Sequence, residues 1–233
     1  MVINMSISVI VTAGGSGTRL GGEVPKQFQM LGDRPVLAHT LGVFDSLDIR
    51  EIVVAVPGGY IDHTWEIVRS HGFSKVRGIV SGGVNRAESV LTALKQLPRD
   101  TGIVLIHDGV RPFVSKELIK AVAKATYECS AAVAGTVLTD TLKEVDSHGQ
   151  VVSTPDRQRF WRVQTPQGFT YKLIMDAYAQ GEKDGILSYV TDDSTLVERL
   201  DVPVMMVEGS SDNIKITTRE DLILSELLLE NHR

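Results

Sequence analysis

The regular alternation of short apolar runs with stretches of helical periodicity constrains the fold of this chain more than any other feature. The runs are nearly continuous and rich in valine and isoleucine, which is typical of strands covered on both faces. They occupy residues 8–11, 52–56, 76–80, 103–106, 131–137 and 204–207. Because right-handed crossovers connect strands that alternate with helices, the pattern predicts an α/β fold with a mostly parallel sheet flanked by helices.

Three of the intervening stretches have the spacing of an amphipathic helix. Their apolar positions are Ala87, Val90, Leu91 and Leu94 in the first, Leu118, Ile119, Val122 and Ala123 in the second, and Leu222, Ile223 and Leu227 in the third. The residues expected to cap these helices are Asn85, Ser115 and Thr218. Glu88 and Asp221 lie three residues after a cap, as in a capping box.

One polar segment, from about residue 138 to 159, interrupts the alternation. Traces of period-two spacing flank a turn at Asp146 to Gly149, so we expect a protruding β-hairpin arm. The arm has too few apolar residues to form its own core, and a second subunit is a reasonable surface for it to pack on. We expect residues 1–233 to form a single domain, because no linker, repeat or low-complexity stretch is visible.

The charge balance argues against some classes of partner. Lysine and arginine number 24 and aspartate and glutamate 29, a formal charge of −5, so no global basic field exists to hold nucleic acid or an anionic membrane. The first residues lack a basic signal region and no apolar stretch approaches the ~20 residues of a membrane span, so we expect a cytoplasmic protein. The single cysteine, Cys129, is expected to be a buried thiol in a reducing compartment.

A glycine-rich segment, AGGSGTRLGGEVPKQ at residues 13–27, follows the first strand. Glycines let backbone N–H groups converge on phosphate oxygens, and open α/β sheets bind ligands beyond the carboxyl ends of their strands. The segment does not fit the dinucleotide fingerprint, because Leu20 stands where a small residue is needed. It does not fit the Walker A loop either, because Glu23 stands in place of lysine.

Two cations, Arg19 and Lys26, lie in the same segment, with Pro25 fixing the backbone before the lysine. Fixed cations beside converging N–H groups suit a triphosphate whose leaving pyrophosphate gains negative charge in the transition state. The alternative is a glycine-rich turn with solvated charges. The strand exit, the two cations and the Pro-Lys-Gln sequence together favour a phosphate site.

Further candidates stand near two other strands. Asp108 follows the run at 103–106, where it can face a metal–phosphate complex or a substrate hydroxyl, and Arg111 can hold an anion. Alternatively, the two side chains pair and cap the turn. His107 is expected to have a packing or hydrogen-bonding role. Lys215 lies just before the third helix, where it would by itself be an ordinary surface charge.

Seven segments, in order, closely resemble the 2-C-methyl-D-erythritol 4-phosphate cytidylyltransferase family. They are AGGSGTRLG with PKQ, SGG with NRAESV, HDGVRPF, TDTLKEV, DRQRFWRVQTPQGF, VTDDSTLVE and DNIKITTREDL, and they span about Val9 to Leu229. The resemblance implies a Rossmann-like nucleotidyltransferase domain that uses CTP, Mg²⁺ or another divalent cation, and methylerythritol phosphate. It also implies a homodimer in which the arm reaches the partner's active site.

The resemblance assigns roles to individual residues. Arg19 and Lys26 match family residues that stabilise the transition state, and Arg157 and Lys215 match those that position the acceptor phosphate. The matches on the nucleotide side are Ala13, Gly14, Gly15, Gly83 and Ser89. The matches on the acceptor side are Asp108, Arg111, Thr141, Thr165 and Thr191, with Asp108 also a candidate metal ligand. The sequence departs from the pattern at Val84, where some members carry an acidic residue, so any ligand contact there must use the backbone.

Two other readings remain open. A pentitol-phosphate cytidylyltransferase, acting on ribitol 5-phosphate, has a similar loop and similar HD-x-VRPF and QTPQ segments, although the arm matches the methylerythritol enzyme better. A glycosyltransferase or a non-catalytic nucleotide-sugar binder on a related fold is the rival from another class. The absence of an Asp-x-Asp metal motif argues against the first of these, and the retained loop cations argue against the second.

Overall fold

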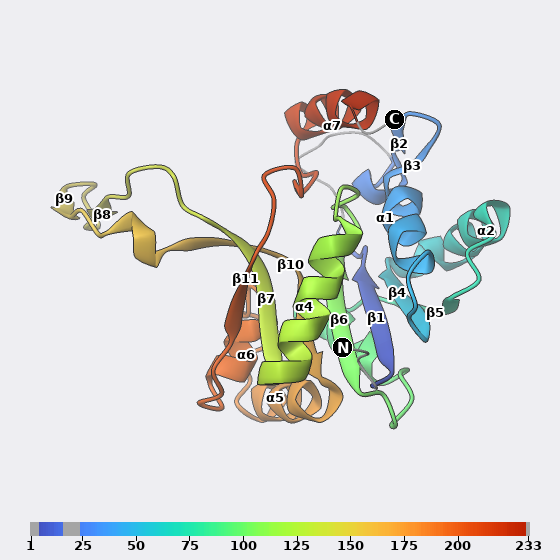
Figure 1. The fold of residues 1–233 in the computed structure, drawn as a ribbon, viewed down its shortest axis with the longest axis horizontal. Helices are drawn as coiled ribbons and strands as arrows, with labels where there is room; N and C mark the ends of the chain where they lie inside the picture. The colour runs from blue at the N-terminus through green and yellow to red at the C-terminus, as the bar shows by residue number, and fades with distance from the viewer. Residues whose placement is uncertain (1–4, 16–23, 232–233) are drawn as a thin grey trace.

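The centre of the structure, a computed structural model that describes residues 5–15 and 24–231, is a seven-stranded sheet (Figure 1). Its strands are β1 (Ile7–Thr12), β4 (Glu51–Val56), β5 (Val76–Ser81), β6 (Ile103–Asp108), β7 (Ala131–Val137), β10 (Trp161–Thr170) and β11 (Met205–Glu208). Their order is β11-β7-β10-β6-β1-β4-β5. Only β10 is antiparallel to its neighbours within this sheet, so the predicted mostly parallel α/β sheet is confirmed.

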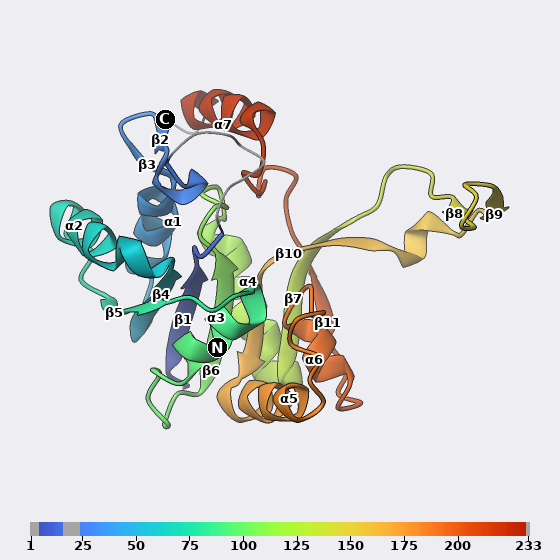
Figure 2. The ribbon, with the colours of Figure 1, turned by 180° about the vertical axis from the view of Figure 1, so that it is seen from behind.

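Helices cover both faces of the sheet, as Figures 1 and 2 show. Side chains alternate along a strand, so Val9 and Val11 of β1 point to one face and Ile10 to the other. The first face is covered by α1 (Val36–Asp45), α2 (Ile61–His71) and α4 (Lys116–Cys129). The second face is covered by α3 (Arg86–Leu94), α5 (Tyr171–Lys183) and α6 (Ser194–Glu198). Burial on both faces explains why the strands are apolar throughout.

The predicted caps of α3 and α4 are present. The Asn85 side chain accepts a hydrogen bond from the Glu88 N–H at 2.9 Å, and the Ser115 hydroxyl accepts one from the Leu118 N–H at 3.1 Å. The Glu88 carboxylate accepts from the Val84 N–H and the Asn85 amide. Both helices therefore start where the sequence predicts, and α3 starts immediately after the Gly82–Gly83 turn.

The C-terminal helix α7 (Arg219–Asn231) forms as predicted, but only part of its expected apolar stripe packs on the rest of the chain. Leu222 of that stripe packs, together with Leu229, on a small cluster of buried residues from β2 (Met30–Leu31), the start of α1, the β6–α4 loop and the segment before α7. Ile223 and Leu227 are 54% and 56% exposed, so for these two residues the prediction is wrong. None of the helices in the described ranges has the length and apolar character needed to cross a membrane.

Strand β10 is the strand of the seven-stranded sheet that the sequence analysis did not predict; helices α1, α2, α5 and α6 were not predicted either. The buried positions of β10 include Gln164, Thr165 and Gln167, and a register irregularity against β7 lies between Val163 and Gln167. These polar residues interrupt the continuous apolar run that marks a strand covered on both faces, so the sequence pattern does not show β10 even though it lies between β6 and β7. Cys129 is a smaller correction: it is exposed at the end of α4, so the expectation of a buried thiol is wrong.

The segment between β7 and β10 projects away from the sheet in Figures 1 and 2. It carries β8 (Glu144–Val145) and β9 (Val151–Ser153), which pair antiparallel, and the 3-10 turn η3 (Arg157–Arg159). A turn lies between the two strands. Gly149 has a φ of 80°, and the Asp146 carboxylate accepts from the N–H groups of His148 and Gln150.

Candidate active site

A cavity of about 370 Å³ lies where β1 and β6 end and α3 begins. The predicted site residues that line it are Ala13, Gly14, Gly15, Lys26, Gly83, Ser89, Asp108 and Lys215. We call it the nucleotide cavity, because it is lined by the residues that the resemblance assigns to the nucleotide side. Among the described residues, three cationic side chains, Lys26, Arg86 and Lys215, line it against one carboxylate, that of Asp108. The cavity is therefore suited to an anion.

The backbone at residues 13–15 passes close to Ser89 and Lys26. A Cβ atom on Gly14 would lie 3.4 Å from the Ser89 hydroxyl oxygen, and one on Gly15 would lie 3.6 Å from the Lys26 side chain. The buried Gln27 donates from its side-chain amide to the Ala13 carbonyl at 2.6 Å. This bond ties the 3-10 turn η1 (Lys26–Phe28) to the end of β1 and so fixes the backbone of Lys26 beside the cavity.

The turn before α3 is held by Ser89 and Glu88. The Ser89 hydroxyl accepts from the Gly83 N–H at 3.0 Å and donates to the Asn85 carbonyl at 2.8 Å. Its single hydrogen is therefore in use, and its remaining capacity is one acceptor position. Val84 is 96% exposed, and its N–H donates to Glu88 at 2.9 Å. In this arrangement the Val84 N–H is already engaged, which leaves its carbonyl for a ligand.

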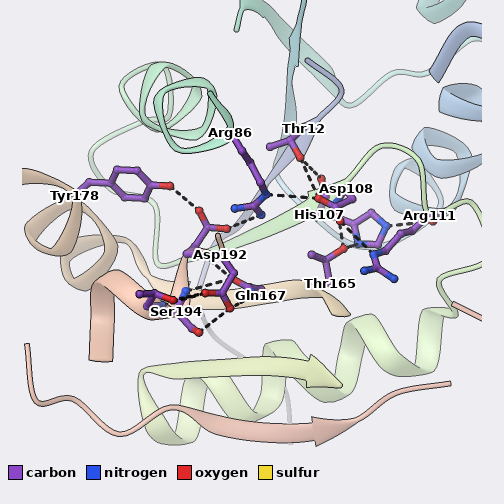
Figure 3. A network of polar contacts seen from close by, with 12 residues as sticks. Thr12, Arg86, His107, Asp108, Arg111, Thr165, Gln167, Tyr178, Asp192 and Ser194 are labelled. Carbon is purple, nitrogen blue, oxygen red and sulfur yellow. Dashed lines mark hydrogen bonds and ion pairs between the residues drawn. The ribbon is translucent and has the colours of Figure 1, made fainter. Parts of the chain in front are cut away.

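Asp108 is the centre of a charged network at the floor of the cavity (Figure 3). One of its oxygens lies 3.0 Å from Lys215 Nζ and 3.2 Å from Arg111 Nε, and the other lies 3.6 Å from Arg86 Nε. Burial by itself would raise the pKa of Asp108, but Lys215, Arg86 and Arg111 outweigh it and hold that pKa far below its usual value. Asp108 is therefore a permanently ionised anchor for three cations.

Arg111 and Asp108 form the structural pair that was one of the two readings of the sequence, and both also line a cavity. Arg111 also donates to the Asn213 carbonyl at 2.7 Å, and the buried Asn213 amide donates to the Thr165 carbonyl at 2.9 Å. These bonds fasten the segment before α7 to β10 and to the β6–α4 loop. They bring Lys215 to Asp108 across more than 100 residues of sequence.

His107 has the hydrogen-bonding role that was expected. Its Nε2 lies 3.2 Å from the Arg111 carbonyl, which can only accept, so Nε2 carries the hydrogen. Nδ1 then accepts from the Thr165 hydroxyl at 3.0 Å, and that hydroxyl accepts from the Asp108 N–H at 3.1 Å. Burial lowers the pKa of His107 to about 4, so the ring is neutral near pH 7.

A second cavity, of about 400 Å³, adjoins the first, because Arg86, Asp108 and Lys215 line both. We call it the acceptor cavity. The predicted acceptor-side residues in it are Asp108, Arg111, Thr165 and Thr191. Asp192 also lines it, with its oxygens bonded to Gln167, Ser194 and Thr195. Hydroxyl and carboxylate groups outnumber cations here, which suits a hydroxylated ligand more than a second polyphosphate.

Some predicted residues are not brought to these cavities. Arg19 lies outside the described residues. Thr141 and Arg157 belong to the projecting segment and line neither cavity in this chain. Arg157 is exposed in η3 and donates to the Thr139 carbonyl at 2.7 Å.

Arg86 and Asp193 are site residues that the sequence did not reveal. Arg86 Nη2 lies 2.7 Å from the fully buried Asp193 carboxylate, which also accepts from the Tyr178 hydroxyl at 2.6 Å. Both residues stand inside the quoted NRAESV and VTDDSTLVE segments, next to residues that were singled out. An arginine at the first position of a helix has no spacing signal of its own, so the pair becomes visible only in three dimensions.

In the nucleotide cavity, the described residues offer a divalent cation one carboxylate rather than a cage. No group of three or more histidine, cysteine, aspartate or glutamate side chains is placed to hold a metal ion in the described ranges. Mg²⁺ in nucleotide enzymes is commonly held by one or two carboxylates together with substrate phosphates, and Asp108 in the nucleotide cavity fits that arrangement. Lys215, Arg86 and Arg111 already contact its oxygens, so phosphates would provide most of the ligands.

Comparisons with known proteins agree on one family. The family model described as 2-C-methyl-D-erythritol 4-phosphate cytidylyltransferase matches residues 7–231. Proteins of that name from Alkaliphilus oremlandii and Syntrophotalea carbinolica are 42% and 44% identical over 229 residues, and each match covers 97% of this chain. It covers 96% and 97%, respectively, of those proteins.

Solved structures give the same result. The 4-diphosphocytidyl-2C-methyl-D-erythritol synthase from Anaerococcus prevotii matches with a TM-score of 0.86 and 34% identity, over 97% of this chain and 96% of that one. The cytidylyltransferase from Thermus thermophilus matches with a TM-score of 0.78 and 33% identity, over 97% of this chain and 100% of that one. Relatives this similar over nearly their whole length share more than a fold. The chain belongs to the 2-C-methyl-D-erythritol 4-phosphate cytidylyltransferase family.

Proposed function

We propose that this enzyme transfers the cytidylyl group of CTP to 2-C-methyl-D-erythritol 4-phosphate, giving 4-CDP-2-C-methyl-D-erythritol and pyrophosphate. The observation that carries the proposal is the pair of adjoining cavities that share Arg86, Asp108 and Lys215. A reaction that joins two phosphates needs two phosphate-bearing ligands side by side over a common cationic floor. Membership in the family supports the identity of both substrates, and hence a place in isoprenoid precursor synthesis.

On the nucleotide side, CTP would lie along the end of β1 and the start of α3. The small residues Ala13, Gly14 and Gly15 leave room for close approach to its phosphates, and Lys26 stands beside them. Gly83 and the Ser89 hydroxyl would meet the cytidine end. A pocket built of small residues and backbone groups can exclude a purine by size as well as by hydrogen bonding.

On the acceptor side, the polyol would occupy the acceptor cavity. Thr165 and Thr191 offer hydroxyl groups, and Arg111 and Asp108 stand at the boundary with the nucleotide cavity. Lys215 lines both cavities, so it can contact the acceptor phosphate while CTP is bound. This supports the role that the family resemblance gives to Lys215.

The chemistry follows from these positions. An oxygen of the acceptor phosphate attacks the α-phosphorus of CTP in line with the departing pyrophosphate. A phosphate monoester has its second pKa at about 6, so the nucleophile is ionised near neutral pH and no general base is needed. Lys26 and Arg19 would stabilise the charge that develops on the triphosphate, and Lys215 and Arg157 would hold the acceptor phosphate against it.

A divalent cation, which we propose to be Mg²⁺, would neutralise part of the triphosphate charge when bound. Asp108 is the residue best placed to contact it, with the phosphates as the main ligands. The protein's own contribution is then positioning and charge stabilisation rather than proton transfer.

We further propose that the chain is one nucleotidyltransferase domain that works as a homodimer. The two large hydrophobic clusters share the same sheet, which supports a single domain. The projecting segment exposes Val145, Val151 and Val152, each more than half exposed, which supports a role in contact with a second chain. In such a dimer, Thr141 and Arg157 would reach the partner's acceptor cavity. Phosphorylated substrates that do not cross membranes support a cytoplasmic enzyme.

The assay that tests the function measures pyrophosphate release and product mass on mixing the enzyme, Mg²⁺ and CTP with methylerythritol phosphate or ribitol 5-phosphate. We expect turnover with methylerythritol phosphate to exceed that with ribitol 5-phosphate, and CTP to exceed ATP, GTP and UTP. The Lys26→Ala variant should remain folded and lose turnover. A higher rate with ribitol 5-phosphate would identify a pentitol-phosphate enzyme. CTP binding without release of pyrophosphate from CTP, whichever acceptor is added, would identify a binding protein.

A further inference from the structure

We propose that Arg86 is a positioning residue that holds the nucleotide side and the acceptor side of the active site in a fixed relation. The proposal extends the proposed function, because it assigns to a residue outside the predicted set the task of aligning the two substrates. It depends on one guanidinium group that contacts two carboxylates belonging to different parts of the fold.

The first contact is on the nucleotide side. Arg86 is the first residue of α3, directly after the turn that carries Gly83, and its side chain is only 23% exposed. Its Nε lies 3.6 Å from an oxygen of Asp108, toward which it points in Figure 3. The same carboxylate also contacts Lys215. Arg86 therefore connects the start of α3 to the end of β6.

The second contact is on the acceptor side. Arg86 Nη2 lies 2.7 Å from the carboxylate of Asp193, which has no solvent exposure. The Tyr178 hydroxyl of α5 donates to the other oxygen of Asp193, and the Asp193 N–H donates to the Gln167 side chain of β10 at 2.9 Å. Asp193 is thus anchored from three directions, and it lies two residues after Thr191, which lines the acceptor cavity.

The chemistry of arginine suits this position. A guanidinium is planar and presents several N–H donors in a fixed fork, so it can contact two carboxylates at once. Lysine has its three donors on one nitrogen, so it cannot place two separate nitrogens against the two carboxylates as Arg86 does with Nε and Nη2. Asp193 is fully buried and a buried carboxylate needs a cationic or hydrogen-bonding partner, so the contact is also part of the fold. A test must therefore separate positioning from simple neutralisation of Asp193.

The consequence for the reaction is geometric. Asp108 fixes Lys215 beside the nucleotide cavity, and Asp193 fixes the segment that carries Thr191 beside the acceptor cavity. Arg86 contacts both carboxylates, so it sets the distance between the two substrates without needing to touch either. A misplacement of about 1 Å between reacting groups can cost about 100-fold in rate.

The test uses Arg86→Met, Asp193→Asn and the double variant, with Arg77→Met on β5 as a control for loss of an exposed arginine. Arg86→Met leaves the Asp193 carboxylate buried without its cation, so we expect a lower melting temperature and a kcat lower by about 100-fold. Asp193→Asn keeps the side-chain shape and an oxygen that can accept from Arg86, so its kcat should fall much less than that of Arg86→Met. The double variant removes both charges and should recover the melting temperature of Asp193→Asn while keeping the low kcat of Arg86→Met.

The outcomes separate the two explanations. If the double variant regains the kcat of Asp193→Asn, Arg86 only neutralises Asp193 and the proposal is wrong. If Arg86→Lys restores both the melting temperature and kcat, the forked geometry is not needed and the proposal is also wrong. Recovery of the melting temperature alone by Arg86→Lys supports it.

A measurement on the unliganded protein keeps this result distinct from that of the proposed function. Amide hydrogen exchange at residues 191–195 should lose protection in Arg86→Met, because the contact that anchors Asp193 is gone, and should be unchanged in Arg77→Met. Wild-type protein that shows no turnover would refute the proposed function. Unchanged exchange at residues 191–195 in Arg86→Met would refute the positioning role of Arg86, whatever the activity of the wild type.

Discussion

At the scale of single residues, His107 and Asp108 are adjacent in the chain and buried together, yet they carry opposite electrostatic roles. Asp108 contacts three cationic groups and stays charged. His107 contacts a carbonyl and a hydroxyl, which do not require it to be charged, and burial keeps it neutral. Both side chains are buried, so the difference in charge state comes from the groups that each side chain faces and not from a difference in burial.

The neutral His107 predicts a specific dependence of stability on pH. Its pKa is about 4 in the folded chain against an ordinary value of 6.5, so between these values the unfolded chain takes up a proton that the folded chain does not. This contribution is fully present above pH 6.5 and is lost as the pH falls toward 4. The difference of about 2.5 pKa units corresponds to about 3 kcal/mol in the free energy of unfolding.

Urea unfolding of the wild type and of His107→Gln between pH 4 and 7.5 measures this contribution. The free energy of unfolding should fall more steeply with decreasing pH in the wild type than in the variant. His148→Gln, which changes an exposed histidine of the projecting segment, should follow the wild type. Parallel curves for wild type and His107→Gln would contradict the assignment. Asp108 does not interfere, because its own contribution is lost only below its ordinary pKa of about 4.

At the scale of elements, the turn between β5 and α3 is packed too closely to accept a side chain at one position. A Cβ atom on Gly83 would lie 2.3 Å from the Glu88 Cβ and 3.2 Å from its backbone carbon. Glu88 cannot move away easily, because it caps the turn through the Val84 N–H and the Asn85 amide. The Gly83 N–H also donates to Ser89 in the nucleotide cavity.

We therefore expect Gly83→Ala to lower the free energy of unfolding by about 1–3 kcal/mol, the usual cost of an overpacked position, and to raise the KM for CTP. Denaturant unfolding and steady-state kinetics with varied CTP measure the two effects. Gly59→Ala is the matched control, because a Cβ there meets nothing within 4 Å. Equal effects of the two substitutions would argue against steric packing as the cause.

Strand β10, which lies between β6 and β7 in the sheet, is the second element that shapes the site. An antiparallel strand between β6 and β7 carries Thr165 next to Asp108 and Gln167 next to Asp193. The polar residues that hide β10 from pattern analysis are thus the ones that build the acceptor cavity. Their side chains have buried partners only when β6 and β7 flank the strand, so the pattern of nearby residues does not indicate that these positions are buried.

At the scale of the whole molecule, the segment that carries β8, β9 and η3 projects away from the sheet in Figure 1, and Arg157 of η3 lines neither cavity of its own chain. A homodimer that exchanges these segments predicts that two inactive variants complement each other. In a heterodimer of Lys26→Ala with Arg157→Ala, one site keeps both its own Lys26 and the partner's Arg157. An equal mixture that reassorts freely should reach about one quarter of wild-type activity, because half of the dimers carry one intact site of two.

The control for this experiment is each variant alone at the same total concentration, which should show almost no turnover. Analytical ultracentrifugation of the wild type should show a dimer. A dimer whose mixed variants remain inactive would mean that Arg157 does not act across the interface. A monomer with full activity would exclude a shared site altogether.

The sequence by itself determined the class of fold and most of the nucleotide side. Strands buried on both faces must be apolar throughout, and helices that cover them need a stripe and a cap, so β1, β4, β5, β6, β7, β11, α3 and α4 were predictable. The sequence also put Gly14, Gly15 and Lys26 within a few residues of one strand end, and in the structure the three line one cavity there; their role with phosphates stays a prediction. Strand composition, helix stripes and helix caps each depend on residues that are close together in the chain, so they can be recognised in the sequence.

The tertiary structure alone decided how the two sides of the site are joined. Lys215 reaches Asp108 because Asn213 is bonded to β10, and Arg86 reaches Asp193 because α3 and the segment before α6 lie on the same face of the sheet. Contacts between residues about 100 positions apart produce no periodic pattern in the sequence from which they could be predicted. A buried charge is stable only beside a group of opposite charge or a hydrogen-bond partner, and here the packing of the sheet and its helices places that partner.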